Sequence, residues 1–245
     1  MKKSTKLIAG YLVFTFLFAS TAFVIVRTSN QIFKRNSSNA VSHEIDSIPQ
    51  IVIDAGHGGE DGGASNGDYL EKHLNLDISL TLSDLFTLFG YDAILTRRDD
   101  SLLYDYFNDL EDYTGKKKTY DLKNRLRIAE ESGAEIYIGV HMNKFPKEQY
   151  KGLQVYYSPN TKESETAAQI IQSYAKKYLM PENNREIKCA NQSIYILKRI
   201  TIPAVLVECG FLSNPEELAL LSTREYRNKV ALSVFSSSTE FLTQN

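Results

Sequence analysis

Short apolar runs and longer amphipathic stretches alternate along the chain after residue 48. The apolar runs predict strands at 51–54, 92–96, 136–140, 152–158, 194–197 and 204–207. The stretches with helical periodicity predict helices at 74–89, 121–131, 167–178 and 223–242. Asn214 followed by Pro215 predicts one more helix start, because asparagine caps a helix N-terminus and proline suits its first turn.

Strands that are apolar on both faces and alternate with helices are typical of a sheet buried between two helical layers. We therefore expect an α/β fold, a single domain with a mostly parallel or mixed six-stranded sheet flanked by helices on both faces. Residues 100–120 interrupt this alternation with acidic, aromatic and finally basic side chains. They predict a long excursion from the scaffold, whose aromatic residues either form a sugar- or partner-facing surface or pack locally.

The N-terminus has a different character. Residues 7–26 carry no charge and follow three lysines, and as a helix they would span about 30 Å, the thickness of a bilayer core. This pattern predicts a signal peptide or membrane anchor at 1–26; the length favours an anchor, and the small residues 20–22 allow cleavage. The polar residues 27–48 predict a flexible stalk, and 49–245 the folded domain. In both cases the domain is expected outside the cytoplasm.

Composition narrows the function classes. The chain has 28 basic and 30 acidic residues and a formal net charge of -2, which argues against nucleic acid as a partner. Apolar residues make up 42% of the chain, enough for one sizeable core. Two cysteines cannot build a disulfide framework, and whether Cys189 and Cys209 pair is left open.

Polar residues stand where three predicted strands end. The first strand leads to His57, the third to His141, and the last to Glu208, while Glu71 lies just before the first helix. In open α/β sheets, sites form beyond the carboxyl ends of the strands. Two histidines and one carboxylate with an open position make a catalytic zinc arrangement, and a further carboxylate such as Glu208 would serve as general base.

Spacing alone leaves alternatives open, because these residues match no short motif such as HExxH. His57 could instead form hydrogen bonds in a glycine-rich turn. His141 could be a histidine at a strand end whose ring nitrogens are hydrogen-bonded to the protein. Glu208 could be a salt-bridge partner. A carboxylate after four apolar residues is costly to bury unpaired, so a charged partner or a metal is expected near Glu208.

Five ordered segments carry a resemblance. They are IVIDAGHGGEDGGAS (51–65), LEKHLNL (70–76), TRRD (96–99), IGVHMN (138–143) and VECGFLSN (207–214). Together they resemble the zinc-dependent N-acetylmuramoyl-L-alanine amidases of the third amidase family, over essentially the whole domain. Ala55 and Gly62 depart from that pattern, since proline is common at both positions.

The resemblance implies a set of roles. His57, Glu71 and His141 match the family's zinc ligands, with one Zn²⁺ per chain, and Glu208 matches its catalytic glutamate. The implied reaction is hydrolysis of the amide that joins N-acetylmuramic acid to L-alanine in peptidoglycan. Zinc would activate water and polarise the carbonyl, and Glu208 would pass the water's proton to the leaving amine.

Weaker candidates surround these four residues. Asn143 would bind substrate or steady His141, or else cap a loop. Arg97 and Arg125 would bind peptide carboxylates, or else form structural ion pairs. Asp61 would orient a ligand histidine, or else form a turn.

A narrower resemblance concerns the biological setting. A signal or anchor, a short stalk and one amidase domain, together with segments 120–125 and 195–198, look like the germination-specific, spore-cortex branch. That branch implies muramic-δ-lactam formation in cortex peptidoglycan, a protein activator as partner, and membrane contact through the N-terminal segment. Two other functions stay open, a non-catalytic peptidoglycan-binding regulator and a zinc peptidase acting on stem peptides.

Overall fold

One six-stranded sheet organises the computed structural model, which describes residue 48 and residues 50–109 and 115–244. The predicted signal or anchor, and the predicted stalk up to residue 47, lie outside the described residues. In chain order the elements are β1 (Gln50–Ala55), β2 (Ser65–Asn66), β3 (Tyr69–Leu70), α2 (Glu71–Leu88), β4 (Asp92–Leu95), α3 (Lys117–Ser132), β5 (Ile136–Asn143), β6 (Gln154–Tyr157), α4 (Lys162–Tyr174), the π-helix η1 (Ala175–Leu179), β7 (Lys188–Cys189), β8 (Ala204–Phe211), α5 (Pro215–Leu221) and α6 (Arg224–Gln244). Within the described ranges, none of the helices combines the length and the apolar character needed to cross a bilayer.

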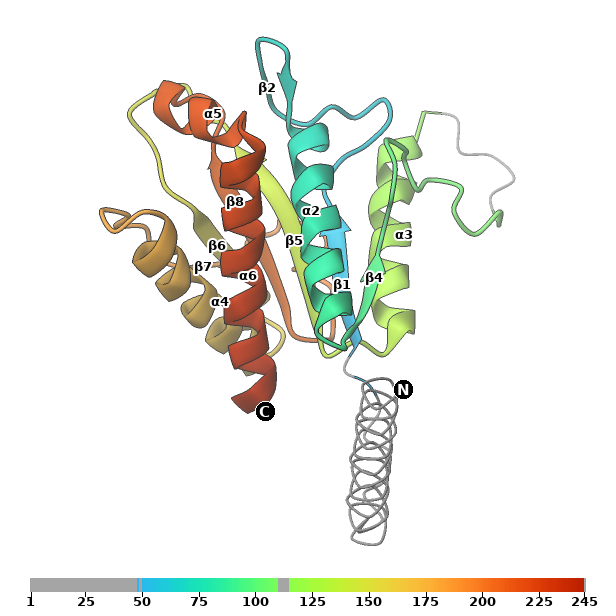
Figure 1. Ribbon diagram of the computed structural model, residues 1–245. Helices are drawn as coiled ribbons and strands as arrows, with labels where there is room; N and C mark the ends of the chain where they lie inside the picture. Colours follow the sequence, from blue (N-terminus) through green and yellow to red (C-terminus); the bar gives the residue numbers. More distant parts are fainter. Residues whose placement is uncertain (1–47, 49, 110–114, 245) are drawn as a thin grey trace, which may run out of the picture. The chain divides into compact units, whose positions relative to one another are not determined.

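The strands follow the order β4-β1-β5-β8-β6-β7 (Figure 1). β1 runs parallel to β4 and β5, and β5 runs parallel to β8. β6 pairs antiparallel with β8 and parallel with β7, so the sheet is mixed. The predicted α/β fold with a mostly parallel or mixed six-stranded sheet is therefore confirmed. The parallel strands β1, β5 and β8 lie side by side, so their carboxyl ends meet at one edge.

Each face of the sheet has its own apolar core, because successive side chains of a strand point to opposite faces. Ile51 and Ile53 of β1 join the core beneath α2, α4 and α6. Val52 between them joins the core on the opposite face, which α3 and residues 190–202 cover. Figure 1 shows α2, α4 and α6 together in front of the sheet.

One predicted strand is wrong. Residues 194–197 form turns rather than a strand, and the sixth strand is the two-residue β7. Ile196 and Leu197 are buried against the sheet, and the N–H of Ile200 donates to the carbonyl of Ile196 within the turn. A short apolar run signals burial, but it does not distinguish a buried turn from a strand.

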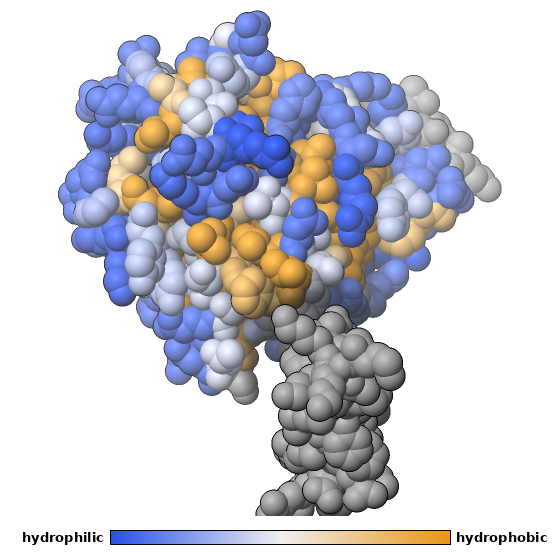
Figure 2. All heavy atoms as spheres, viewed as in Figure 1, coloured by the Kyte–Doolittle hydropathy of each residue, from blue (hydrophilic) through white to orange (hydrophobic). Residues whose placement is uncertain are grey.

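Helices α2 and α3 begin earlier than predicted. α2 begins at Glu71 itself, and α3 begins at Lys117, inside the predicted excursion. Residues 110–114 of that excursion lie outside the described residues. On the face shown in Figure 2, polar residues dominate and apolar ones gather where α2 ends, in keeping with the exposed side chains of Leu88 and Phe89.

Candidate active site

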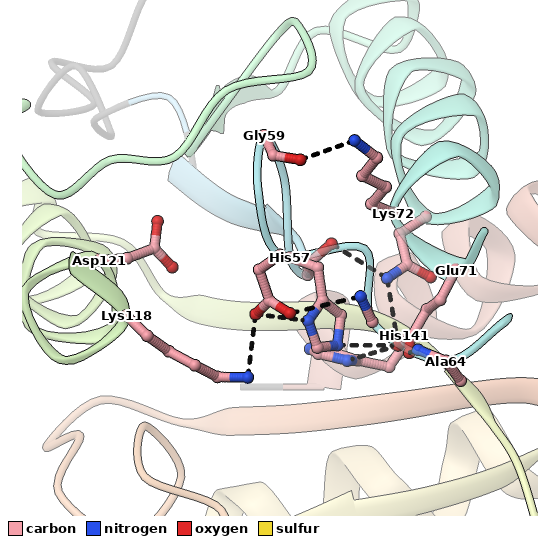
Figure 3. A network of polar contacts seen from close by, with 12 residues as sticks. His57, Gly59, Ala64, Glu71, Lys72, Lys118, Asp121 and His141 are labelled. Atoms are coloured by element: carbon pink, nitrogen blue, oxygen red, sulfur yellow. Dashed lines mark hydrogen bonds and ion pairs between the residues drawn. The ribbon is translucent and has the colours of Figure 1, made fainter. Parts of the chain in front are cut away.

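The carboxyl ends of β1, β5 and β8 bring together residues that are far apart in sequence. His57 follows β1 by two residues, His141 lies in β5, and Glu208 in β8 pairs with His141 in parallel register. Side chains in parallel register point to the same face of a sheet. Glu71 completes the group because α2 begins at this same edge. Figure 3 shows the rings of His57 and His141 converging on Glu71.

The three predicted zinc ligands form one cluster. Glu71 Oε1 lies 3.2 Å from His57 Nε2 and 2.9 Å from His141 Nδ1. One potential ligand atom from each of the three side chains lies within 4.8 Å of the others. Two imidazoles and one carboxylate are the donor set of a catalytic zinc site, which leaves a position open for water or substrate.

Glu71 is held in place from its own loop and from β5. Its Oε2 accepts a hydrogen bond from the N–H of Ala64 at 2.7 Å, and its Oε1 accepts one from the N–H of Met142 at 3.0 Å. Burial would raise the pKa of Glu71, but hydrogen bonds from His141 and His57 outweigh burial and hold the pKa well below its usual range. The carboxylate is therefore ionised, as a metal ligand must be.

His57 sits in a strained backbone conformation, with φ at 63°. Positive φ is uncommon for a non-glycine residue and is often found at functional sites. Its Nδ1 lies 2.9 Å from Asp61 Oδ2, which leaves Nε2 directed at Glu71. Burial would lower the pKa of His57, but Glu71 and Asp61 outweigh burial and raise it. The site thus favours positive charge, and Asp61 lies where its predicted role as an orienting partner requires.

Two glycines permit this close packing. A Cβ added to Gly56 would lie 2.3 Å from the His141 ring, and one added to Gly63 would lie 2.6 Å from Glu71 Oε2. No side chain fits at such distances, and Gly63 also has a φ of 67°. Part of the glycine-rich segment after β1 is therefore required by the cluster itself.

Glu208 faces the cluster from β8. Its Oε2 is buried and has no hydrogen-bond partner among the described residues. Burial raises the pKa of Glu208 to about 7, and the attraction of His141 offsets this only in part. A buried carboxylate oxygen without a partner is unfavourable unless a ligand or metal-bound group supplies one. A pKa near neutrality also suits a group that must both accept and donate a proton.

Arg125 does not face a substrate. Both its Nη1 donors are used, on Asp54 Oδ1 at 2.6 Å and on the carbonyl of Ala55. Both its Nη2 donors are used, on the carbonyl of His57 and on Asp121, which also accepts from Nε. All five N–H donors are therefore occupied by protein atoms. The alternative of a structural ion pair replaces the substrate-binding prediction for this residue.

Arg97 has a similar environment and is buried. Its guanidinium donates to the carbonyls of Ala55, Gly56, Lys72 and Asp99. These carbonyls occupy four of the five N–H donors of Arg97. Arg97 ties the loop after β1 to α2, which favours a structural role in holding the loop that carries His57. Binding of a substrate carboxylate by Arg97 stays a prediction.

Asp54→Asn is expected to lower the free energy of unfolding by about 3 kcal/mol at neutral pH, because Arg125 would lose one buried partner. Burial would raise the pKa of Asp54, but Arg125 and hydrogen bonds from Thr96 and Tyr137 outweigh it and lower the pKa to about 2, against an ordinary value of 3.8. The stabilisation is therefore complete above about pH 4 and is lost as the pH falls towards 2. Urea unfolding of both proteins from neutral pH into the acid range measures this.

Asp84→Asn is the matched control for that experiment. Asp84 is exposed on α2 and forms no ion pair with a described residue, so its substitution should change stability by no more than about 0.5 kcal/mol. If Asp54→Asn were as mild as this control, the Asp54–Arg125 pair would not support the fold.

The remaining predicted residues have simpler positions. Asn143 ends β5 beside the cluster, half-buried, and its side chain makes no hydrogen bond with a described residue. Its amide is thus free to meet a substrate. Cys189 is exposed, Cys209 is buried, and they are not bonded to each other.

Residues that motif analysis did not identify also border the cluster. Lys118 Nζ lies 3.1 Å from Asp61 Oδ2. Figure 3 shows the side chain of Lys118 extending towards His57. Lys118 is one of the lysines at the end of the predicted excursion. A cavity of about 240 Å³ opens between α3 and residues 193–197, with His141 in its wall. A larger cavity of about 430 Å³ lies between η1 and α6, and none of its lining residues belongs to the cluster.

Comparison with known proteins adds independent findings. Residues 51–237 match the family Amidase_3, described as N-acetylmuramoyl-L-alanine amidase. A germination-specific N-acetylmuramoyl-L-alanine amidase of Bacillus subtilis (strain 168) is 34% identical over 217 residues, which cover 87% of this chain and 90% of that protein.

Solved structures are similar as well. The CwlD amidase from Clostridioides difficile, solved in complex with the GerS lipoprotein, is 39% identical with a TM-score of 0.74, covering 80% of this chain and 100% of that one. The N-acetylmuramoyl-L-alanine amidase AmiC2 of Nostoc punctiforme is 27% identical with a TM-score of 0.67, covering 80% of this chain and 97% of that one.

Proposed function

Because the chain belongs to the Amidase_3 family of N-acetylmuramoyl-L-alanine amidases, we propose that it cleaves the amide between N-acetylmuramic acid and L-alanine with one zinc ion held by His57, Glu71 and His141. The observation that carries the proposal is the convergence of these three side chains beside Glu208, whose buried Oε2 has no partner among the described residues. Two imidazoles and a carboxylate suit zinc in both ligand type and number.

Residues of the chain carry out the remaining steps of the reaction. When bound, zinc supplies Lewis-acid chemistry, which lowers the pKa of water and polarises the carbonyl of the scissile amide. Glu208 accepts the proton of the attacking water and delivers it to the leaving amine of L-alanine. Asp61 fixes the ring of His57 through Nδ1, and Asn143 offers its free amide to the substrate. The glycine-rich segment keeps the cluster tight enough that these groups stay in place.

We also propose a setting in spore cortex. The support is the likeness to a germination-specific amidase and to an amidase solved with a lipoprotein. A cortex enzyme would act outside the cytoplasm, with residues 1–26 as signal or anchor, 27–48 as stalk and 49–245 as the catalytic domain. A protein partner would then assist it, and the apolar segment would keep it near the membrane.

Metal removal and product analysis test the amidase proposal. The full-length chain, purified in mild detergent with zinc, is incubated with isolated peptidoglycan, and the products are identified by mass spectrometry. We expect free stem peptides that begin with L-alanine, and we expect a chelator to abolish their release until zinc is restored.

Each other outcome identifies a different function. A zinc peptidase would leave L-alanine on muramic acid, and a non-catalytic regulator would release nothing under any condition. Release that resists the chelator would contradict the metal assignment while leaving the amidase activity in place.

A further inference from the structure

Arg185 differs from four basic side chains that lie around the cluster. Protein atoms accept from all five N–H donors of Arg125 and from four of the five of Arg97. Lys118 pairs with Asp61, and Lys72 pairs with Asp100. Arg185 forms no ion pair with a carboxylate of the described residues. Its Nε donates to the carbonyl of Lys151 at 2.7 Å and its Nη1 to Gln154 Oε1 at 3.0 Å, while Nη2 donates to no described residue. One edge of this guanidinium is therefore free.

The free edge is held rigidly. The guanidinium carbon lies 4.3 Å from the ring centroid of Phe211 and 5.9 Å from that of Tyr150. The N–H of Arg185 donates to Asn183, which is buried. An arginine stacked on an aromatic ring and fixed at Nε loses little freedom when it binds a ligand.

This arginine also lies on the face of the sheet that carries the cluster. Gln154 of β6 pairs directly with Glu208 of β8, and Glu208 pairs directly with His141. Directly opposed side chains lie on the same face, and neighbouring strands are about 4.8 Å apart, so Gln154 is roughly 10 Å from His141. Burial and the negative charge of Glu208 raise the pKa of Tyr156, while the positive charge of Arg185 lowers it. Arg185 and Glu208 therefore both lie close enough to Tyr156 to influence the same side chain.

We propose that Arg185 binds a carboxylate of the stem peptide and makes the enzyme selective for acidic peptides. This inference rests on the proposed amidase function and assigns the substrate's peptide side to β6. L-alanine and the next residue together span about 7 Å when extended, so a carboxylate on the side chain of that next residue can cover the roughly 10 Å between His141 and Gln154. Arginine is suited to such a partner because its planar fork can donate two parallel hydrogen bonds to a carboxylate.

Binding measurements test this proposal on the full-length, zinc-loaded chain. The probes are L-Ala-D-Glu and its fully amidated counterpart. We expect wild type to bind the acidic dipeptide roughly 10- to 100-fold more tightly, and Arg185→Met to lose that preference while keeping its zinc content. Arg185→Lys keeps the positive charge but lacks the planar guanidinium that donates two parallel hydrogen bonds, so it should retain part of the preference.

A control separates this role from a merely structural one. Arg127 stacks on Phe107 but pairs with Asp109 and Glu131, so Arg127→Met should leave the preference unchanged. Equal weakening of both dipeptides in Arg185→Met, a preference that survives the substitution, or no preference or binding in wild type would each overturn the proposal. If wild type shows the preference but hydrolyses no peptidoglycan, the amidase proposal fails and the carboxylate site stands.

Discussion

Glu208→Gln is expected to bind zinc at close to one ion per chain and to lower kcat by roughly 1,000-fold. Glutamine keeps the size of the side chain but cannot take a proton from water. Glu208 is not among the three clustered ligands, so its substitution should leave the metal in place. Zinc content by elemental analysis and steady-state kinetics on a soluble muropeptide measure the two effects separately.

The burial of Glu208 explains why the effect should be large. Its Oε2 has no protein partner among the described residues, so the carboxylate is available for the reacting groups rather than engaged in a structural pair. Glu163→Gln is the control, because Glu163 is exposed in the first turn of α4. A variant at Glu208 with a near-normal rate would refute the role as base, and one that lost its zinc would make Glu208 part of the metal site.

The convergence of the cluster could be predicted because sites of α/β sheets form beyond the carboxyl ends of their strands. Polar residues after apolar runs identify the carboxyl ends of strands, and parallel neighbours bring those ends to one edge. Local patterns alone therefore predict that His57, His141 and Glu208 lie together. The positive φ of His57, 63°, could not be predicted, because sequence patterns assign such backbone angles to glycine rather than to histidine.

The arginines show where sequence reasoning stops. Arg97 and Arg125 lie in or near recognisable motifs, yet their donors are used by carbonyls and carboxylates that only the fold brings near. Arg185 lies in no motif, and its free edge becomes visible only when Gln154, Lys151 and Phe211 are seen around it. A sequence pattern identifies a charged side chain, but the supply of nearby acceptors decides whether that charge is available to a ligand.

The same limit applies to residues 194–197, where an apolar run was predicted to be a strand. The run is buried as predicted, but it packs on the face of the sheet instead of joining its edge. The error matters for function, because this segment forms one wall of the cavity beside His141. Strand patterns alone would have extended the sheet where the protein instead has an opening next to its reactive centre.

His141→Ala is expected to lose most of the zinc and all measurable amidase activity. The substitution removes one of three clustered ligands, and the remaining His57 and Glu71 form an incomplete site for a catalytic zinc ion. Zinc titration with a competing chelator and hydrolysis of a muropeptide measure both losses. Unchanged zinc affinity would show that His141 is not a ligand.

Two further variants make this result specific to the metal. His73 is exposed at the start of α2, outside the cluster, so His73→Ala should keep zinc and activity. Asp61 would act on a bound zinc ion only through Nδ1 of His57, and such outer partners contribute roughly 10- to 100-fold in metal affinity. Asp61→Asn should therefore weaken zinc binding by that amount, and His141→Ala by more. A reversed order would mean that the loop around His57, rather than the side chain of His141, determines zinc binding.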